Sequence, residues 1–438
     1  MRLTPSRRVY LLGGGLLAAL AIASRKFSSP GAPSFLVPLA AAGIVYLLAI
    51  REFFSTPTFP KRVVIVGLML AAVWHVLFLR LPPGLDDDIH RYVWDGRMQR
   101  LGYSPYVAIP SDPSLARLHT PETRTLNNPN LPSPYPAGAE LFFRAVTAID
   151  ESTFALKVAF VLCDFGIVLV LLDVLRRSGQ GAHWVLAYAW HPLLATDVAG
   201  SGHIDIVGAL LLLVSFAALL RRWRAIAALA FALAVSVKLL PIVLLPLYWR
   251  RVRVRDGVLA VIVLGLLYLP FLHHGWIPTG SLGTYVQYFR FNDPVFATLE
   301  RMAPPQRLVG LAVVVGLVCA IWMRRKSVEA SDAFAWPMAA SLLCAPVVYP
   351  WYLLWLLPFL RSIPTLPLIV WTVAIIPTYY VWHLRTLGRP WLVPGWIMLL
   401  EYGSVAVAGA MIAFRRRTGP AVPRSVTSAR GGDPWDSV

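Results

Sequence analysis

Long apolar stretches follow one another along most of the chain, separated by short polar segments. A helix needs about 20 apolar residues to cross the hydrocarbon core of a bilayer. Such helices satisfy their own backbone hydrogen bonds in lipid, so the pattern predicts an all-α, polytopic transmembrane bundle. The stretches that reach or approach this length are residues 9–24, 34–50, 63–80, 153–175, 183–199, 203–220, 256–272, 307–323, 333–349, 365–382 and 391–414.

Two further apolar stretches are interrupted. Residues 225–248 are interrupted by Lys238 and Pro241, and residues 346–361 contain three prolines. Proline removes a backbone donor and bends or breaks a helix, so both stretches are predicted to be broken rather than continuous spans. With them the pattern predicts roughly 11 to 14 helices, some of half length, in one transmembrane domain over residues 1–414. The polar residues 415–438 are predicted to be a disordered tail.

Composition supports a membrane protein and excludes a soluble one. Of the 438 residues 57% are hydrophobic and only 14% are charged, whereas soluble domains carry about 25% charged residues. The mean hydropathy is +0.63. The three cysteines lie in apolar runs without paired spacing, which argues against a disulfide scaffold or a cysteine metal site.

The basic residues behind the net charge of +18 are placed beside the apolar stretches and do not form a nucleic-acid site. Arginine and lysine clusters stand at the ends of apolar runs, for example at 176–177, 221–224 and 324–326. Positive clusters mark the cytoplasmic side of a membrane protein. This rule predicts cytoplasmic amino and carboxyl termini, and it places residues 81–150 and 273–306 outside the cell membrane.

The first of these two loops carries most of the candidate chemistry. It opens with Asp86, Asp87 and Asp88, and the following spacing predicts a helix from Asp88 to Arg100. In that helix Asp88, Arg91, Tyr92 and Asp95 would share one face, because residues three and four apart are neighbours. The three carboxylates could cap the helix, bind a divalent ion or act as a general base, and spacing does not decide among these roles.

Other polar residues stand out against the apolar background. Residues 137–149, with Glu140, suggest a helix that lies in the membrane interface. Lys238 is a lysine deep inside an apolar run, where an unpaired charge is costly, so it is a candidate site residue or ion-pair partner. The remaining candidates for contacts with a substrate are His90, Arg97, Tyr135, His203, Asp205, Arg290, Tyr349 and Tyr352. Each could instead be structural, and Arg290 could clamp a phosphate with its planar guanidinium.

Several motifs resemble the polytopic GT-C glycosyltransferases. They are DDDIHRYVWDGRMQRLGYSPY at 86–106, YPAGAELFF at 135–143, SGHID at 201–205, a Lys-x-x-Pro beginning at residue 238, and YPWYLLWLLP at 349–358. The nearest likeness is to bacterial alpha-mannosyltransferases that use polyprenyl-phosphate sugars. A more distant likeness is to the enzyme that adds the first mannose of GPI anchors.

The resemblance implies a fold, a reaction and a location. It implies an inverting transferase in the bacterial plasma membrane that moves a sugar, mannose by the nearest likeness, from a polyprenyl-phosphate donor to an extracytoplasmic glycan or glycolipid. An aspartate pair in the GPI-anchor relative aligns with Asp86 and Asp88, which makes either of them the implied catalytic base and Asp87 a substitute. No obligatory metal is expected, although the three carboxylates could hold a divalent cation.

Two other functions fit the same pattern. A transporter or flippase of lipid-linked sugars would also have many helices, broken segments and a buried lysine. A ligase that joins a lipid-linked polymer to an acceptor would share the outward-facing site. The concentration of acidic and aromatic residues in one outer loop, together with the absence of a visible internal repeat, favours the glycosyltransferase.

Overall fold

The computed structural model describes residues 3–418 except 30, 85–86, 273–276 and 327–329. Within these residues the chain is helical apart from turns and loops, and its only β-type pairing is an isolated bridge between Phe291 and Val347. The prediction of an all-α polytopic bundle is therefore confirmed. Residues 419–438, most of the predicted tail, lie outside the described residues.

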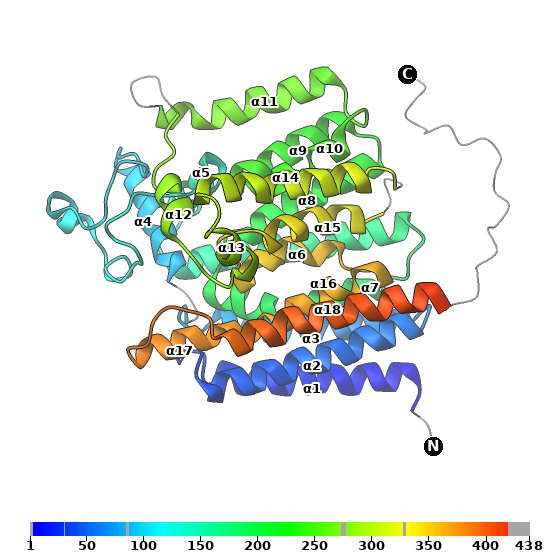
Figure 1. The fold of residues 1–438 in the computed structure, drawn as a ribbon. Coiled ribbons are helices and arrows are strands. Elements are labelled where there is room, and N and C mark those ends of the chain that lie inside the picture. The colour runs from blue at the N-terminus through cyan, green and yellow to red at the C-terminus, as the bar shows by residue number, and fades with distance from the viewer. Residues whose placement is uncertain (1–2, 30, 85–86, 273–276, 327–329, 419–438) are drawn as a thin grey trace.

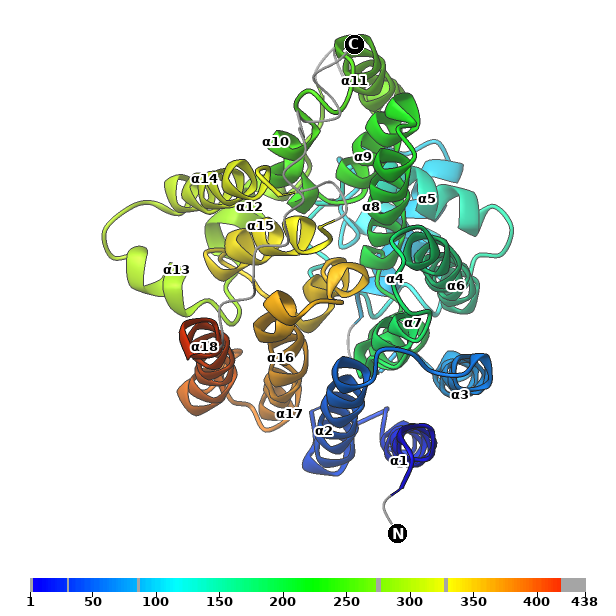
Figure 2. The same cartoon turned by 90° about the vertical axis from the view of Figure 1, so that its right-hand side faces the viewer.

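Eight helical segments in the described part of the chain are long and apolar enough to cross a membrane. They are α1 (Pro5–Ser24), α2 (Pro33–Ser55), α3 (Lys61–Leu79), α6 (Thr153–Arg177), α11 (Val254–Tyr268) with its extension to Phe271, α14 (Pro305–Met323), the segment Ile363–Thr386, and α18 (Gly395–Thr418). Most of the long helices run side by side in Figure 1, and Figure 2 shows them almost end-on.

The outer surface of these helices is as apolar as their packed face. In α3, for example, Trp74 and Phe78 are fully buried, whereas Ile65, Met69 and Val73 are exposed. A helix that is apolar on all sides is stable in lipid and not on the surface of a soluble protein. The chain is therefore an integral membrane protein.

Shorter and broken helices fill the bundle between the long ones. They are α7 (Trp184–Ala189), η2 (Leu194–Ser201), α8 (Asp205–Leu220), α9 (Arg224–Val237), η3 (Leu240–Leu244), α10 (Leu245–Tyr248), α15 (Asp332–Leu343), η5 (Pro350–Trp355) and η6 (Leu357–Phe359). The segment Ile363–Thr386 is itself composed of η7 (Ile363–Thr365), α16 (Leu366–Ala374), η8 (Ile376–Tyr379) and α17 (Tyr380–Thr386).

The two predicted breaks are confirmed. The helix α9 ends at Val237, Lys238 is extended, and the chain continues as the separate short helices η3 and α10. Residues 346–361 form short 3-10 turns instead of a long helix.

The single span predicted for residues 183–199 is wrong. That stretch forms α7 and η2, both too short to cross, and η2 meets α8 at an angle of 120°. Gly202 makes this turn with a φ of 79°, a left-handed conformation that suits glycine. The stretch 333–349 is also shorter than predicted, because α15 ends at Leu343.

The loop elements gather at one end of the bundle. Figure 1 shows α4 (Asp88–Arg100), α5 (Ala137–Thr147), α12 (Leu282–Tyr288) and α17 at one end, while α1 begins and α18 ends at the other. The loops 81–150 and 273–306 thus lie on the same side, as predicted, in so far as they are described. Two short helices complete these loops, η1 (Pro113–Leu118) and α13 (Pro294–Leu299).

Candidate active site

A large cavity opens at the end of the bundle where α4 and α12 lie. Its volume is about 1280 Å³, more than most small-molecule sites, which hold about 300–1,000 Å³. Its walls come from the start of α4, residues 125–136, the break at Lys238, α12, residues 345–355, and the end of α17 with residues 389–392. Segments far apart in the sequence therefore build one site.

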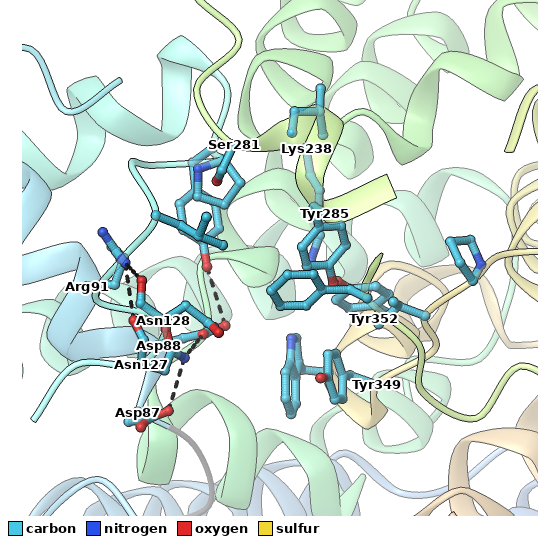
Figure 3. Close-up of a pocket in the computed structure, with 18 of the residues that line it drawn as sticks. Asp87, Asp88, Arg91, Asn127, Asn128, Lys238, Ser281, Tyr285, Tyr349 and Tyr352 are labelled. Atoms are coloured by element: carbon cyan, nitrogen blue, oxygen red, sulfur yellow. Dashed lines mark hydrogen bonds between the residues drawn. The ribbon is translucent and has the colours of Figure 1, made fainter. Parts of the chain in front are cut away.

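Asp87 and Asp88, here called the acidic pair, form one wall of the cavity (Figure 3). The helix α4 begins at Asp88, as the spacing predicted, and Asp87 is its N-cap residue. The Asn127 side-chain amide donates to both carboxylates, at 3.0 Å to Asp87 Oδ1 and 2.6 Å to Asp88 Oδ1. The Tyr135 hydroxyl donates to the other oxygen of Asp88 at 3.3 Å. Both oxygens of Asp88 are thus held in a fixed direction.

Burial raises the pKa of the Asp88 carboxyl above its ordinary value. The neighbouring charge of Asp87 raises it further, whereas the bonds from Asn127 and Tyr135 and the charge of Lys238 lower it. Such a shift brings a carboxyl closer to the pH at which a general base works best.

Two more residues of α4 line the cavity beside the acidic pair. Arg91 is only 3% exposed, and its Nη2 atom donates to the backbone carbonyls of Asn127 at 3.1 Å and of Asn128 at 2.8 Å. His90 faces the charge of Asp87, yet burial has the larger effect and lowers the pKa of the imidazole. This shift favours the neutral form of the His90 imidazole.

Behind this wall lies a second pair of carboxyl groups, Asp95 and Glu140, here called the buried carboxyl pair. Both side chains are 0% exposed. Glu140 accepts hydrogen bonds from Ser133 and, at 2.9 Å, from Gln99. Burial raises the pKa of both groups above their ordinary values. The helix α5 therefore packs Glu140 into the protein interior, against α4.

The wall opposite the acidic pair combines an ion pair with aromatic rings. Lys238 Nζ donates to Asp205 Oδ1 at 2.8 Å and lies 3.6 Å from the centre of the Tyr352 ring. The indole of Trp355 donates to the same oxygen of Asp205 at 2.7 Å. The hydroxyls of Tyr285 and Tyr352 lie 2.6 Å apart. A paired charge and aromatic faces suit a polar ring with apolar patches, such as a sugar.

Arg290 and Tyr349, both selected from the sequence, also line the cavity. Arg290 is engaged by Glu300, at 3.1 Å from Nε to Oε2. Tyr349 is stacked on Trp351, with ring centres 4.4 Å apart. The face of Trp351 that Tyr349 covers is therefore not free to stack on a substrate.

Three of the described residues that were selected from the sequence do not line the cavity. Arg97 donates to the Leu118 carbonyl and pairs with Glu151, away from the site. Asp95 lies behind Arg91, and His203 is buried and stacked on Trp351 at 4.1 Å. Asp86 lies outside the described residues.

The residues of the cavity that were not selected from the sequence include Asn127, Arg385 and Arg389. Asn127 belongs to an Asn-Asn-Pro sequence in a polar loop. Such a sequence predicts a turn, but it does not predict which residues the Asn127 side chain contacts. The two arginines follow an apolar run and belong to none of the motifs singled out in the sequence. Their place in the site depends on tertiary contacts.

Among the described residues, no group of three or more His, Cys, Asp or Glu side chains is arranged to hold a metal ion. Asp86 is not part of that description, so the role of divalent cations stays a prediction.

Comparison with known proteins gives one match. The profile of a protein family described as "Alpha-(1->6)-mannopyranosyltransferase, N-terminal domain" matches residues 15–252, which is more than half of the chain. The matched region includes the acidic pair, Asp205 and Lys238. No curated protein and no solved structure matches the sequence.

Proposed function

The chain belongs to the alpha-(1->6)-mannopyranosyltransferase family, and from this premise we propose that it transfers mannose from a polyprenyl-phosphate donor to a glycan or glycolipid of the cell envelope. The observation that carries the proposal is the acidic pair in the wall of a cavity of about 1280 Å³. A base beside a space for two substrates is what a sugar transfer without a bound nucleotide requires.

Asp88 acts as the general base in this proposal. The acceptor hydroxyl oxygen attacks the anomeric carbon of mannose while its proton passes to the Asp88 carboxylate. The bond from that carbon to the phosphate oxygen breaks, and its electron pair leaves on polyprenyl phosphate. Attack opposite the leaving group inverts the anomeric configuration. Tyr135 and Asn127 support this role because they fix both oxygens of Asp88 at the cavity wall.

The leaving phosphate needs positive charge, and the end of α17 supplies it. Arg385 lies in the last turn of α17, and Arg389 follows directly after the left-handed turn at Gly388, where φ is 69°. Both arginines line the cavity, and neither has a carboxylate partner among the residues that the structure describes. Arg290, selected from the sequence as a phosphate clamp, is already paired with Glu300. The two unpaired arginines are therefore the better site for a phosphate.

The linkage in the family description extends the proposal to the acceptor. An alpha-(1->6) product requires attack by a hydroxyl on carbon 6 of the acceptor sugar. This primary hydroxyl protrudes from the ring on a flexible arm. It can reach a base in the cavity wall while the acceptor ring stacks on the aromatic side chains nearby.

We further propose that the cavity faces away from the cytoplasm and that both termini are cytoplasmic. The basic clusters at the carboxyl-terminal ends of α6, α8, α14 and α18 lie at the end of the bundle opposite the cavity (Figure 1). Positive residues concentrate on the cytoplasmic side of membrane proteins.

The test is a transfer assay with purified protein, radiolabelled polyprenyl-phosphate mannose and membrane glycolipids. Wild-type protein should convert label into a glycolipid or glycan product, and Asp87→Asn combined with Asp88→Asn should abolish conversion. The matched control combines Asp112→Asn with Asp150→Asn, which removes two charges from exposed positions of the same loop.

Two outcomes would reject the proposal. Label that crosses liposome membranes without transfer would identify a flippase. Full transfer by the variant without the acidic pair would show that the base lies elsewhere.

A further inference from the structure

We propose that Asn127 is a positioning residue that holds Asp87 and Asp88 together and keeps Asp88 ready to accept a proton. This inference rests on the proposed function only in naming Asp88 as the base. Asn127 carries no charge and cannot itself take the proton, so its contribution acts through the two carboxylates.

A single nitrogen of the Asn127 amide contacts both carboxylates of the acidic pair. One nitrogen, Nδ2, carries two hydrogens, and it lies 2.6 Å from an oxygen of Asp88 and 3.0 Å from an oxygen of Asp87 (Figure 3). Each carboxylate can thus receive one hydrogen. Two adjacent carboxylates repel each other, and a shared donor offsets this repulsion where the site is partly withdrawn from water.

Asn127 is itself held by the helix that carries Asp88. Arg91, one turn further along α4, donates to the backbone carbonyls of Asn127 and Asn128. On the other side of Asn127, Leu126 is buried in a cluster with Trp94 of the same helix. The amide therefore cannot move independently of the acidic pair.

The backbone of the turn also fits this role. Asn128 has a φ of 45°, in the left-handed region, which asparagine and aspartate adopt more readily than other side chains. Its carbonyl is one of the two that Arg91 contacts, at 2.8 Å. The left-handed residue thus presents its carbonyl to Arg91, and the side chain of the residue before it points to the carboxylates.

The bond from Asn127 favours the ionised form of Asp88 and lowers the pKa of this carboxyl against the effect of burial. The other groups that act on Asp88 are Asp87, Lys238 and Tyr135, and the hydroxyls of Tyr285 and Tyr352 face its charge across the cavity. Burial and the charge of Asp87 both raise the pKa of Asp88. Without the amide, fewer groups would oppose this rise. Asp88 would then stay protonated to a higher pH and would accept a proton less readily.

The test compares Asn127→Asp with Asn128→Asp in full-length protein in lipid nanodiscs. Both changes add one carboxylate to the same turn, and aspartate tolerates the left-handed backbone of position 128. Only Asn127→Asp replaces the amide that donates to the acidic pair with a carboxylate, which accepts hydrogen bonds and does not donate them. We expect the acid limb of the kcat/KM profile to move up by about one pH unit or more in Asn127→Asp, which is about a tenfold loss below the pKa. Asn128→Asp should move it less.

A second measurement does not depend on activity. The Asp88 carboxyl band is identified in infrared titrations as the band that Asp88→Asn removes, and its midpoint is compared between the variants. A midpoint in Asn127→Asp equal to that of wild type, or equal shifts in both variants, would overturn the inference. An activity loss that is constant across pH would reduce Asn127 to a structural residue. Absence of mannose transfer by wild type would reject the proposed function, while the infrared midpoints would still decide the role of Asn127.

Discussion

The helix α4 contributes one residue to each of two carboxyl pairs, and the surroundings of the two pairs differ. The acidic pair stands at its first turn and opens to the cavity, whereas Asp95, two turns further on, meets Glu140 in the interior. In the acidic pair the Asn127 amide donates to both carboxylates, and together with Tyr135 and the charge of Lys238 it opposes the rise in the Asp88 pKa that burial causes. In the buried carboxyl pair burial is the largest effect and favours the protonated form.

The difference teaches that residue type and helix face do not define a role by themselves. Asp88 and Asp95 are the same residue on the same side of one helix. Access to the cavity makes Asp88 useful as a base, because a substrate hydroxyl must come within hydrogen-bond distance of it. Glu140 joins α5 to α4 through a hydrogen bond from Gln99. The buried carboxyl pair therefore stabilises the wall that carries the acidic pair.

The largest expected effect tests this division directly. Asp88→Asn should lower kcat by about 10²–10⁴-fold, the usual contribution of a general base. Asp95→Asn should leave kcat of the folded protein within about threefold of wild type, because Asp95 does not touch the cavity. Both values come from transfer assays normalised to folded protein after size-exclusion chromatography. A larger loss in Asp95→Asn than in Asp88→Asn would reverse the assignment of the two pairs.

The sequence predicted local features of this wall and not its long-range contacts. The segment Asp88–Arg100, considered as a helix from the sequence, forms α4. The pairing of Asp95 with Glu140 and of Asp88 with Asn127 depends on residues about 40 positions away. The periodicity of a sequence does not indicate such long-range contacts. From the sequence alone, Asp95 is therefore a candidate substrate-binding residue.

The same limit explains the other successes and failures. Lys238 and the following proline marked the break after α9, because both are costly inside an apolar helix. The partner of Arg290 is only ten residues away, but Glu300 follows a separate short helix, α13, and no helical spacing links the two. The residues 183–199 were apolar enough for a span, yet apolar core helices and spans have the same composition.

The second expected effect is opposite pH dependence of stability and activity. Burial raises the pKa of Asp95 to about 7 and that of Glu140 well above its ordinary value. The folded state thus binds more protons than the unfolded state, so this stabilisation is complete below about pH 4 and is lost as the pH rises through 7. Each additional proton corresponds to about 1.4 kcal/mol per pH unit. Activity should instead rise with pH, because Asp88 must be ionised.

Thermal unfolding followed by intrinsic fluorescence between pH 5 and 8 checks the stability part. Wild type should unfold at a lower temperature as the pH rises, and the double variant Asp95→Asn with Glu140→Gln should show a flatter dependence. The two substitutions preserve size and remove the titration. An equal slope of unfolding temperature against pH in both proteins would mean that other groups determine the pH dependence of stability. The buried carboxyl pair would then not be the pH-sensitive part of the wall.

The smallest expected effect concerns Arg91, which connects the two pairs. Arg91→Lys keeps a positive charge beside Asp95 and Glu140 but loses the planar guanidinium that donates to the Asn127 and Asn128 carbonyls. We expect kcat/KM to fall about fivefold, the equivalent of about one hydrogen bond, with little change in thermal stability. Arg91→Met should lower both, because it also leaves the inner carboxyl groups without their cation. A loss of stability in Arg91→Lys as large as in Arg91→Met would show that the arginine supports the interior alone, and that the turn carrying Asn127 holds its place without it.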